Sequence, residues 1–203
     1  MHCPTSLAFL LLTGLLSLTA WTALAAERNR VRVLYDFEDP AELEGLRAEA
    51  QNVGFDLVQD NGVTRGRNCC RMVFKKGSDW AAFHFGKDRL QDWQHFDYIA
   101  FDIFSDRTDK VDFCFELMDG LSRNYHTRCS FEGQTIRPGR QTVVIPINRA
   151  KRNGKEGRDW DELEPQDKIR MDALTRVKFF LTPPKGEDLV LWVDHIRLLQ
   201  EDA

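Results

Sequence analysis

Residues 98–118 read YIAFDIFSDRTDKVDFCFELM and contain two runs in which every second side chain is strongly apolar. The apolar set is Ile99, Phe101 and Ile103 in the first run and Val111, Phe113, Phe115 and Leu117 in the second. This period of two is typical of a β-strand that buries one face. The stretch therefore predicts two strands whose apolar sets lie in a core, with Asp102 and Glu116 on the opposite faces.

Similar alternating runs recur along most of the chain. They predict further strands over residues 31–37, 70–74, 80–85, 125–131, 141–147, 177–181 and 189–199. Turn signals such as Asn61-Gly62, Lys76-Gly77 and Pro138-Gly139 separate them. Short strands between turns, with little helix, predict an all-β fold, namely a two-sheet antiparallel β-sandwich with four or five strands in each sheet.

Two segments depart from this pattern. Residues 7–26 carry no charge and end in Ala23-Leu24-Ala25, which fits the cleavage site of a secretory signal peptide over residues 1–25. An uncleaved membrane anchor is the alternative, since about 20 apolar residues span a bilayer. The remaining residues 26–203 are expected to form one domain, in which residues 149–172 make a polar excursion. A cleaved signal predicts a secreted or periplasmic protein with no membrane attachment.

The net charge and the absence of catalytic motifs argue against two classes of function, nucleic-acid binding and catalysis. The formal net charge of −4 argues against a nucleic-acid binder, which normally carries a basic surplus. The sequence has no nucleophile elbow, P-loop or zinc-protease motif, and its histidines are scattered singly. We therefore expect binding rather than catalysis.

Four cysteines follow the predicted signal peptide: Cys69, Cys70, Cys114 and Cys129. Adjacent strand residues point to opposite faces, so Cys69 and Cys70 cannot both reach one neighbouring pair. The two readings that remain are buried free thiols and a cross-strand bridge between Cys114 and Cys129.

Five segments, taken in order, resemble the galactose-binding-like jelly rolls, which include many carbohydrate-binding modules of glycoside hydrolases. They are FED at 37–39, GVTRGRNCCRMVF at 62–74, DWQHFDYIAFDI at 92–103, PGRQTVVIP at 138–146 and WVDHIRL at 192–198. The resemblance implies a structural Ca²⁺ with Glu38 and Asp194 as ligands, together with carbonyl groups of the turn Gly62–Gly66. Calcium accepts such oxygen ligands. Otherwise the two carboxylates are ordinary strand-end groups.

A sugar site combines an aromatic platform with a few placed polar groups. The residues expected to supply them from the polar face of the middle strands are Trp80, His84, Asp102, Glu116, Asn124, His126 and Arg128. The alternative is an ordinary solvated sheet face. The favoured hypothesis is a secreted, non-catalytic carbohydrate-binding protein whose partner is a glycan. The others are a scaffold or assembly domain, like the jelly-roll assembly factor of respiratory complex I, and a small polysaccharide-active enzyme.

Overall fold

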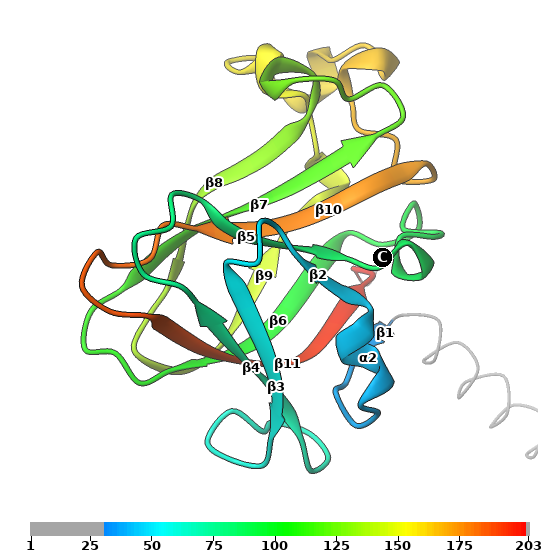
Figure 1. Ribbon diagram of the computed structural model, residues 1–203. Coiled ribbons are helices and arrows are strands. Elements are labelled where there is room, and N and C mark those ends of the chain that lie inside the picture. Colours follow the sequence, from blue (N-terminus) through cyan, green and yellow to red (C-terminus); the bar gives the residue numbers. More distant parts are fainter. Residues whose placement is uncertain (1–30, 202–203) are drawn as a thin grey trace, which may run out of the picture.

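The computed structural model describes residues 31–201, which form two antiparallel sheets packed face to face (Figure 1). The six-stranded sheet contains β1 (Val31–Tyr35), β3 (Val53–Val58), β4 (Cys69–Phe74), β6 (Tyr98–Ser105), β9 (Gly139–Ile145) and β11 (Leu189–Leu199). The five-stranded sheet contains β2 (Leu46–Ala48), β5 (Ala81–Phe85), β7 (Val111–Asp119), β8 (Cys129–Ile136) and β10 (Leu174–Leu181). The predicted all-β sandwich is confirmed. The predicted signal peptide lies outside the described residues.

In both sheets, most neighbouring strands are far apart in the sequence. The six-stranded sheet runs β3-β4-β11-β6-β9, and the five-stranded sheet runs β2-β5-β10-β7-β8. The last strand, β11, is central, because β4 and β1 pair with successive parts of one edge and β6 pairs with the other. Strands β6 and β7 are neighbours in sequence but belong to different sheets. Because of this change of sheet, Asp102 on β6 and Glu116 on β7 lie in different sheets.

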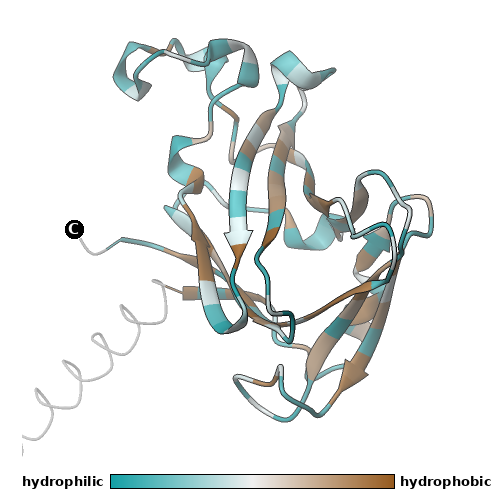
Figure 2. Cartoon of the chain, turned by 90° about the vertical axis from the view of Figure 1, so that its left-hand side faces the viewer, coloured by the Kyte–Doolittle hydropathy of each residue, from teal (hydrophilic) through white to brown (hydrophobic). Residues whose placement is uncertain are grey.

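The core lies between the sheets and is rich in phenylalanine. All seven apolar residues predicted from residues 98–118 are buried. Phe115 packs edge-on against Phe101 with ring centroids 5.5 Å apart, and Phe179 stacks on Phe113 at 4.5 Å. Figure 2 shows hydrophobic bands along the strands and hydrophilic loops at their ends. The alternation in the sequence therefore marks the buried faces correctly.

Three predicted features of the strands are wrong in detail. Residues 125–131 were expected to form a strand, but Tyr125–Thr127 form the 3-10 turn η2 and β8 starts only at Cys129. The cause is local, since the Asn124 side chain accepts the backbone N–H groups of His126 and Thr127 and holds the turn. Strands β2 and β3 were not predicted, and one sheet has six strands instead of four or five.

Helical structure is short throughout. The single α-helical turn α2 (Ala41–Glu44) follows β1, and η1 (Lys87–Arg89) follows β5. The turn η3 (Ile147–Arg149) leads into the polar excursion, which holds η4 (Asn153–Lys155), η5 (Trp160–Glu162) and η6 (Pro165–Asp167). Within residues 31–201, no helix is long and apolar enough to cross a membrane.

A buried arginine holds the excursion on the sandwich. The Arg152 guanidinium pairs with Asp119 at the end of β7 at 2.8 Å and donates to the carbonyl of Gln166 at 2.7 Å. Both partners of the ion pair are buried. These contacts attach the excursion to the end of β7.

Candidate binding groove on the five-stranded sheet

A small apolar cluster lies on the outer face of the five-stranded sheet, separate from the core. Its members are Ala82 on β5, Phe180 on β10 and Cys114 on β7. Each lies between two core residues of its strand, so each points away from the core. Burial raises the pKa of the Cys114 thiol to about 12, so this thiol is neutral and behaves as an apolar group.

Trp80 covers this cluster from one side. Its ring packs edge-on against Phe180 with centroids 5.6 Å apart, yet 63% of the residue is exposed. The residue directly precedes β5 and has a φ of 61°, in the left-handed region that bulky residues rarely adopt. The turn thus holds a large aromatic side chain in solvent beside an apolar floor.

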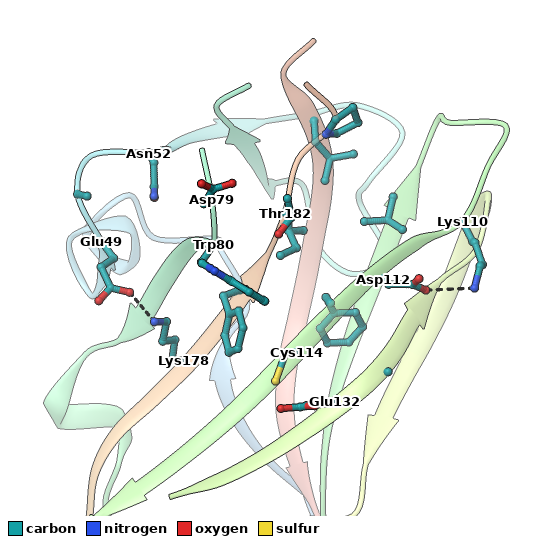
Figure 3. Close-up of a pocket in the computed structure, with 18 of the residues that line it drawn as sticks. Glu49, Asn52, Asp79, Trp80, Lys110, Asp112, Cys114, Glu132, Lys178 and Thr182 are labelled. Atoms are coloured by element: carbon teal, nitrogen blue, oxygen red, sulfur yellow. Dashed lines mark ion pairs between the residues drawn. The ribbon is translucent and has the colours of Figure 1, made fainter. Parts of the chain in front are cut away.

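Two members of this cluster, Cys114 and Phe180, line an open groove of about 910 Å³ that crosses the strands. Glu49, Asn52 and Asp79 lie beside Trp80 at one side of the groove (Figure 3). Tyr125, Arg128, Glu132 and Gly133 line it at the β8 side. The groove therefore joins an aromatic and apolar surface to hydrogen-bonding groups along its length.

Most charges in the groove are paired. The Lys178 ammonium lies 2.6 Å from the Glu49 carboxylate, and Lys110 lies 3.4 Å from Asp112 (Figure 3). Burial alone would raise the pKa of Glu49, but the hydrogen bond and charge of Lys178 lower it overall. Glu49 therefore stays ionised near neutral pH and offers oxygens that accept hydrogen bonds.

A third ion pair links Arg128, which lines the groove, to the buried Glu116. Arg128 Nε lies 2.8 Å from the Glu116 carboxylate, which is only 1% exposed. Burial raises the pKa of Glu116, while the charge of Arg128 opposes this effect. The Arg128 guanidinium also lies 5.5 Å from the centre of the Tyr125 ring. These two contacts hold the Arg128 side chain in place at the β8 side of the groove.

The structure places four of the seven sugar-site residues expected from the sequence on one sheet face, and two of them, Trp80 and Arg128, line the groove. Trp80, His84, Glu116 and Arg128 belong to the outer side of the five-stranded sheet. Asn124 and His126 lie in the turn before β8, where the Asn124 side chain is used as a cap.

Asp102, in contrast, lies on the other sheet, where it cannot reach the groove. Its carboxylate accepts the hydroxyl groups of Thr64 and Thr142 and pairs with Arg197 at 3.0 Å. His195 approaches the same carboxylate to 3.6 Å. The expectation that Asp102 and Glu116 share one face is therefore wrong, because β6 and β7 lie in different sheets.

Sequence reasoning missed most of the residues that line the groove, among them Glu49, Lys178 and Phe180. On β10, Lys178 and Phe180 alternate with the core residues Val177 and Phe179, so the period of two already placed them on the outer face. Nothing in the sequence marks Glu49, which precedes a turn and reaches the groove only through the pairing of β2 with β5.

The two carboxylates predicted to bind calcium both reach the turn that follows Gly62. Asp194 accepts the N–H groups of Thr64 at 2.6 Å and Arg65 at 2.9 Å. Glu38 accepts the N–H groups of Arg67 and Asn68, each at 2.8 Å. These bonds tie the first and last strands to one turn, as the resemblance implies, but with amide hydrogens facing the carboxylates.

This arrangement does not fit Ca²⁺, because a cation needs the turn to present carbonyl oxygens and not N–H groups. Among residues 31–201 there is also no group of three or more His, Cys, Asp and Glu side chains placed to hold a metal ion. Calcium binding therefore stays a prediction, and the orientation of the turn weighs against it.

The cysteines of the described chain are free thiols. Cys114 lies on the outer face of β7, whereas Cys129 lies opposite Leu117 and joins the core. A bridge between Cys114 and Cys129 is therefore excluded, because their side chains occupy opposite faces of the sheet. The alternative of buried free thiols is confirmed for this pair.

Comparison with solved structures finds the same fold at low sequence identity. A family 11 carbohydrate-binding module from Clostridium thermocellum, solved with a β-1,3-1,4-mixed-linked tetrasaccharide, matches with a TM-score of 0.57 and 18% identity, over 84% of this chain and 96% of that one. The xylan-binding CBM22-1 domain of Paenibacillus barcinonensis Xyn10C matches with a TM-score of 0.52 and 9% identity, over 85% and 98%.

The chain has the jelly-roll fold of these modules. An exo-β-agarase also matches, with a TM-score of 0.62 and 12% identity, over 84% of this chain but 25% of the enzyme. No protein-family model and no curated protein matches the sequence. At these identities the likeness shows the fold, and any ligand must be argued from the groove.

Proposed function

We propose that this protein binds a carbohydrate chain in the groove of the five-stranded sheet. The observation that carries the proposal is the exposed Trp80 ring beside the apolar floor of the groove. Sugar rings have apolar faces that stack on such a ring and hydroxyl groups that need hydrogen-bond partners at the edges. Solved modules of this fold were described as bound to a mixed-linked tetrasaccharide or as xylan-binding, which supports the proposal.

The polar groups of the groove suit hydroxyl recognition. Glu49 and Asp112 each keep acceptor capacity besides their ion pair, and Asn52 and Thr182 offer both donors and acceptors. The groove is open and crosses several strands, which suits an extended chain better than a single sugar. We propose binding without catalysis.

The test uses Trp80→Ala in affinity electrophoresis and calorimetry with mixed-linkage β-glucan, xylan and agarose. Loss of the ring should weaken binding at least tenfold, which corresponds to about 1.4 kcal/mol. The melting temperature should fall little, since the contact with Phe180 contributes about 0.5–1.5 kcal/mol. Trp160→Ala is the matched control, because Trp160 is partly exposed in η5 and does not line the groove.

Two results would contradict the proposal. Unchanged binding by Trp80→Ala would remove the groove as the site. A destabilisation of about 3–5 kcal/mol would instead show that the ring acts as a core residue. An assay of reducing-sugar release on the same three polysaccharides separates binding from hydrolysis, and release of sugar ends would show an enzyme.

A further inference from the structure

A row of charged side chains lies on the outer face of the five-stranded sheet, directly beside the groove. It begins at Arg47 on β2, which lies opposite His84 on β5. His84 lies opposite Lys178 on β10, which in turn lies opposite Glu116 on β7. Arg176 stands two residues before Lys178 and on the same face. Neighbouring strands are about 5 Å apart, so these side chains form one continuous surface.

The two carboxylates of this surface already have cations of their own. Glu49 lies 2.6 Å from the Lys178 ammonium, and Glu116 lies 2.8 Å from Arg128 Nε. Glu49 and Lys178 also line the groove, so the charged row and the groove share a border.

The guanidinium groups of Arg47 and Arg176 have no such partner among the described residues. Within residues 31–201, neither Arg47 nor Arg176 has a carboxylate within ion-pair distance, and both residues are exposed. Each guanidinium presents five N–H donors in a planar fork that matches a carboxylate or sulfate group. The surface therefore holds a surplus of positive charge with donors directed at solvent.

The surplus of positive charge also affects the pKa of His84. Burial lowers the pKa of His84, and the charges of Arg176 and Lys178 lower it further, against the opposing effect of Glu49. Its Nδ1 atom is buried and has no hydrogen-bond partner among the described residues. The neutral imidazole therefore lies on the strand between the two arginines without adding a charge to the surface.

The geometry points to an anion subsite at Arg47 and Arg176 that takes a carboxylate or sulfate substituent of a glycan chain lying in the groove. This inference rests on the proposed function and names the class of ligand, an acidic polysaccharide. The chain itself would lie on the apolar floor beneath Trp80, and its acidic group would reach the two guanidiniums across Lys178 and His84. A neutral polysaccharide would use the groove without this subsite.

The experiment compares three cellulose derivatives that share one backbone: hydroxyethyl cellulose is neutral, carboxymethyl cellulose carries carboxylates and cellulose sulfate carries sulfates. Agarose and carrageenan form a second, galactan set of neutral and sulfated chains. Each is titrated against the full chain and against Arg47→Gln/Arg176→Gln. We expect the acidic member of at least one set to bind about tenfold more tightly than its neutral counterpart, and the double variant to remove that advantage.

The control variant is Arg137→Gln/Arg158→Gln, which removes two exposed arginines outside this row and should leave the advantage intact. Carboxymethyl cellulose and cellulose sulfate distinguish the two anions. Equal binding of neutral and acidic polymers, or an acidic preference that survives Arg47→Gln/Arg176→Gln, overturns the anion subsite and leaves carbohydrate binding standing. Absence of binding to every polymer in both sets and to the mixed-linkage glucan and xylan overturns both.

Discussion

Replacement of Arg128 by methionine should strongly destabilise the fold at neutral pH. The substitution keeps most of the apolar stem but leaves the Glu116 carboxylate, 1% exposed, without the cation that lies 2.8 Å away. Loss of one partner of a buried ion pair costs about 3–5 kcal/mol, because an uncompensated charge remains in the interior. Lys178 and Arg176 also lower the pKa of Glu116, though less than Arg128, so we expect the lower end of this range.

The loss should depend on pH with a definite sign. Burial already raises the pKa of Glu116 above its ordinary value of 4.5, and removal of Arg128 raises it further. A carboxyl group whose pKa is higher in the folded state destabilises the fold progressively as the pH rises from the unfolded to the folded pKa. The variant should therefore lose much less stability at about pH 4.5, where Glu116 takes up a proton.

Urea denaturation at pH 7 and at about pH 4.5 measures both effects, and the thermal midpoint at pH 7 should fall by about 6–20 °C. The control is Glu116→Gln/Arg128→Met, in which the neutral amide needs no cation and most of the stability should return. A loss below about 1 kcal/mol at pH 7, an equal loss at both pH values or no recovery in the double variant would refute the reasoning.

Four further outcomes are expected. Phe115→Ala should cost about 3–5 kcal/mol in urea denaturation, since its ring is fully buried between the sheets. Arg152→Met should cost a similar amount and expose residues 149–172 to limited proteolysis, because its buried pair with Asp119 holds the excursion. A chelator should leave the melting temperature unchanged if the turn after Gly62 donates N–H groups as described, whereas a fall would establish a bound cation. Thiol titration should find the four cysteines of the domain reactive only after unfolding, since burial raises their pKa values to about 12 or higher.

The period of two in residues 98–118 was enough to predict two strands and seven core residues, and the same alternation along the chain, broken by turns, predicted the fold class. It works because a strand with one buried face must place every second side chain in the core, whatever its neighbours are. The same rule placed Trp80 and His84 outside the core. It failed at residues 125–131, where a single side chain, Asn124, stabilises a 3-10 turn in place of a strand.

Alternation of apolar residues was not enough to predict which residues form the candidate site. Asp102 and Glu116 both point away from the core, and nothing in their strands distinguishes them. The structure separates them because the chain crosses from one sheet to the other between β6 and β7. The bridge between Cys114 and Cys129 is excluded by strand register in the same way.

Alternation in the sequence was enough to tell which side chains of a strand face the core, since it is a local property of each strand. Which outward residues meet depends on strand order and on register between segments far apart in the chain, and this is visible only in three dimensions. Glu49, Lys178 and Phe180 come together under Trp80 through the pairing of β2, β5 and β10. The meeting of Glu38 and Asp194 at one turn was implied by resemblance, but the direction of the N–H groups in that turn was visible only in three dimensions.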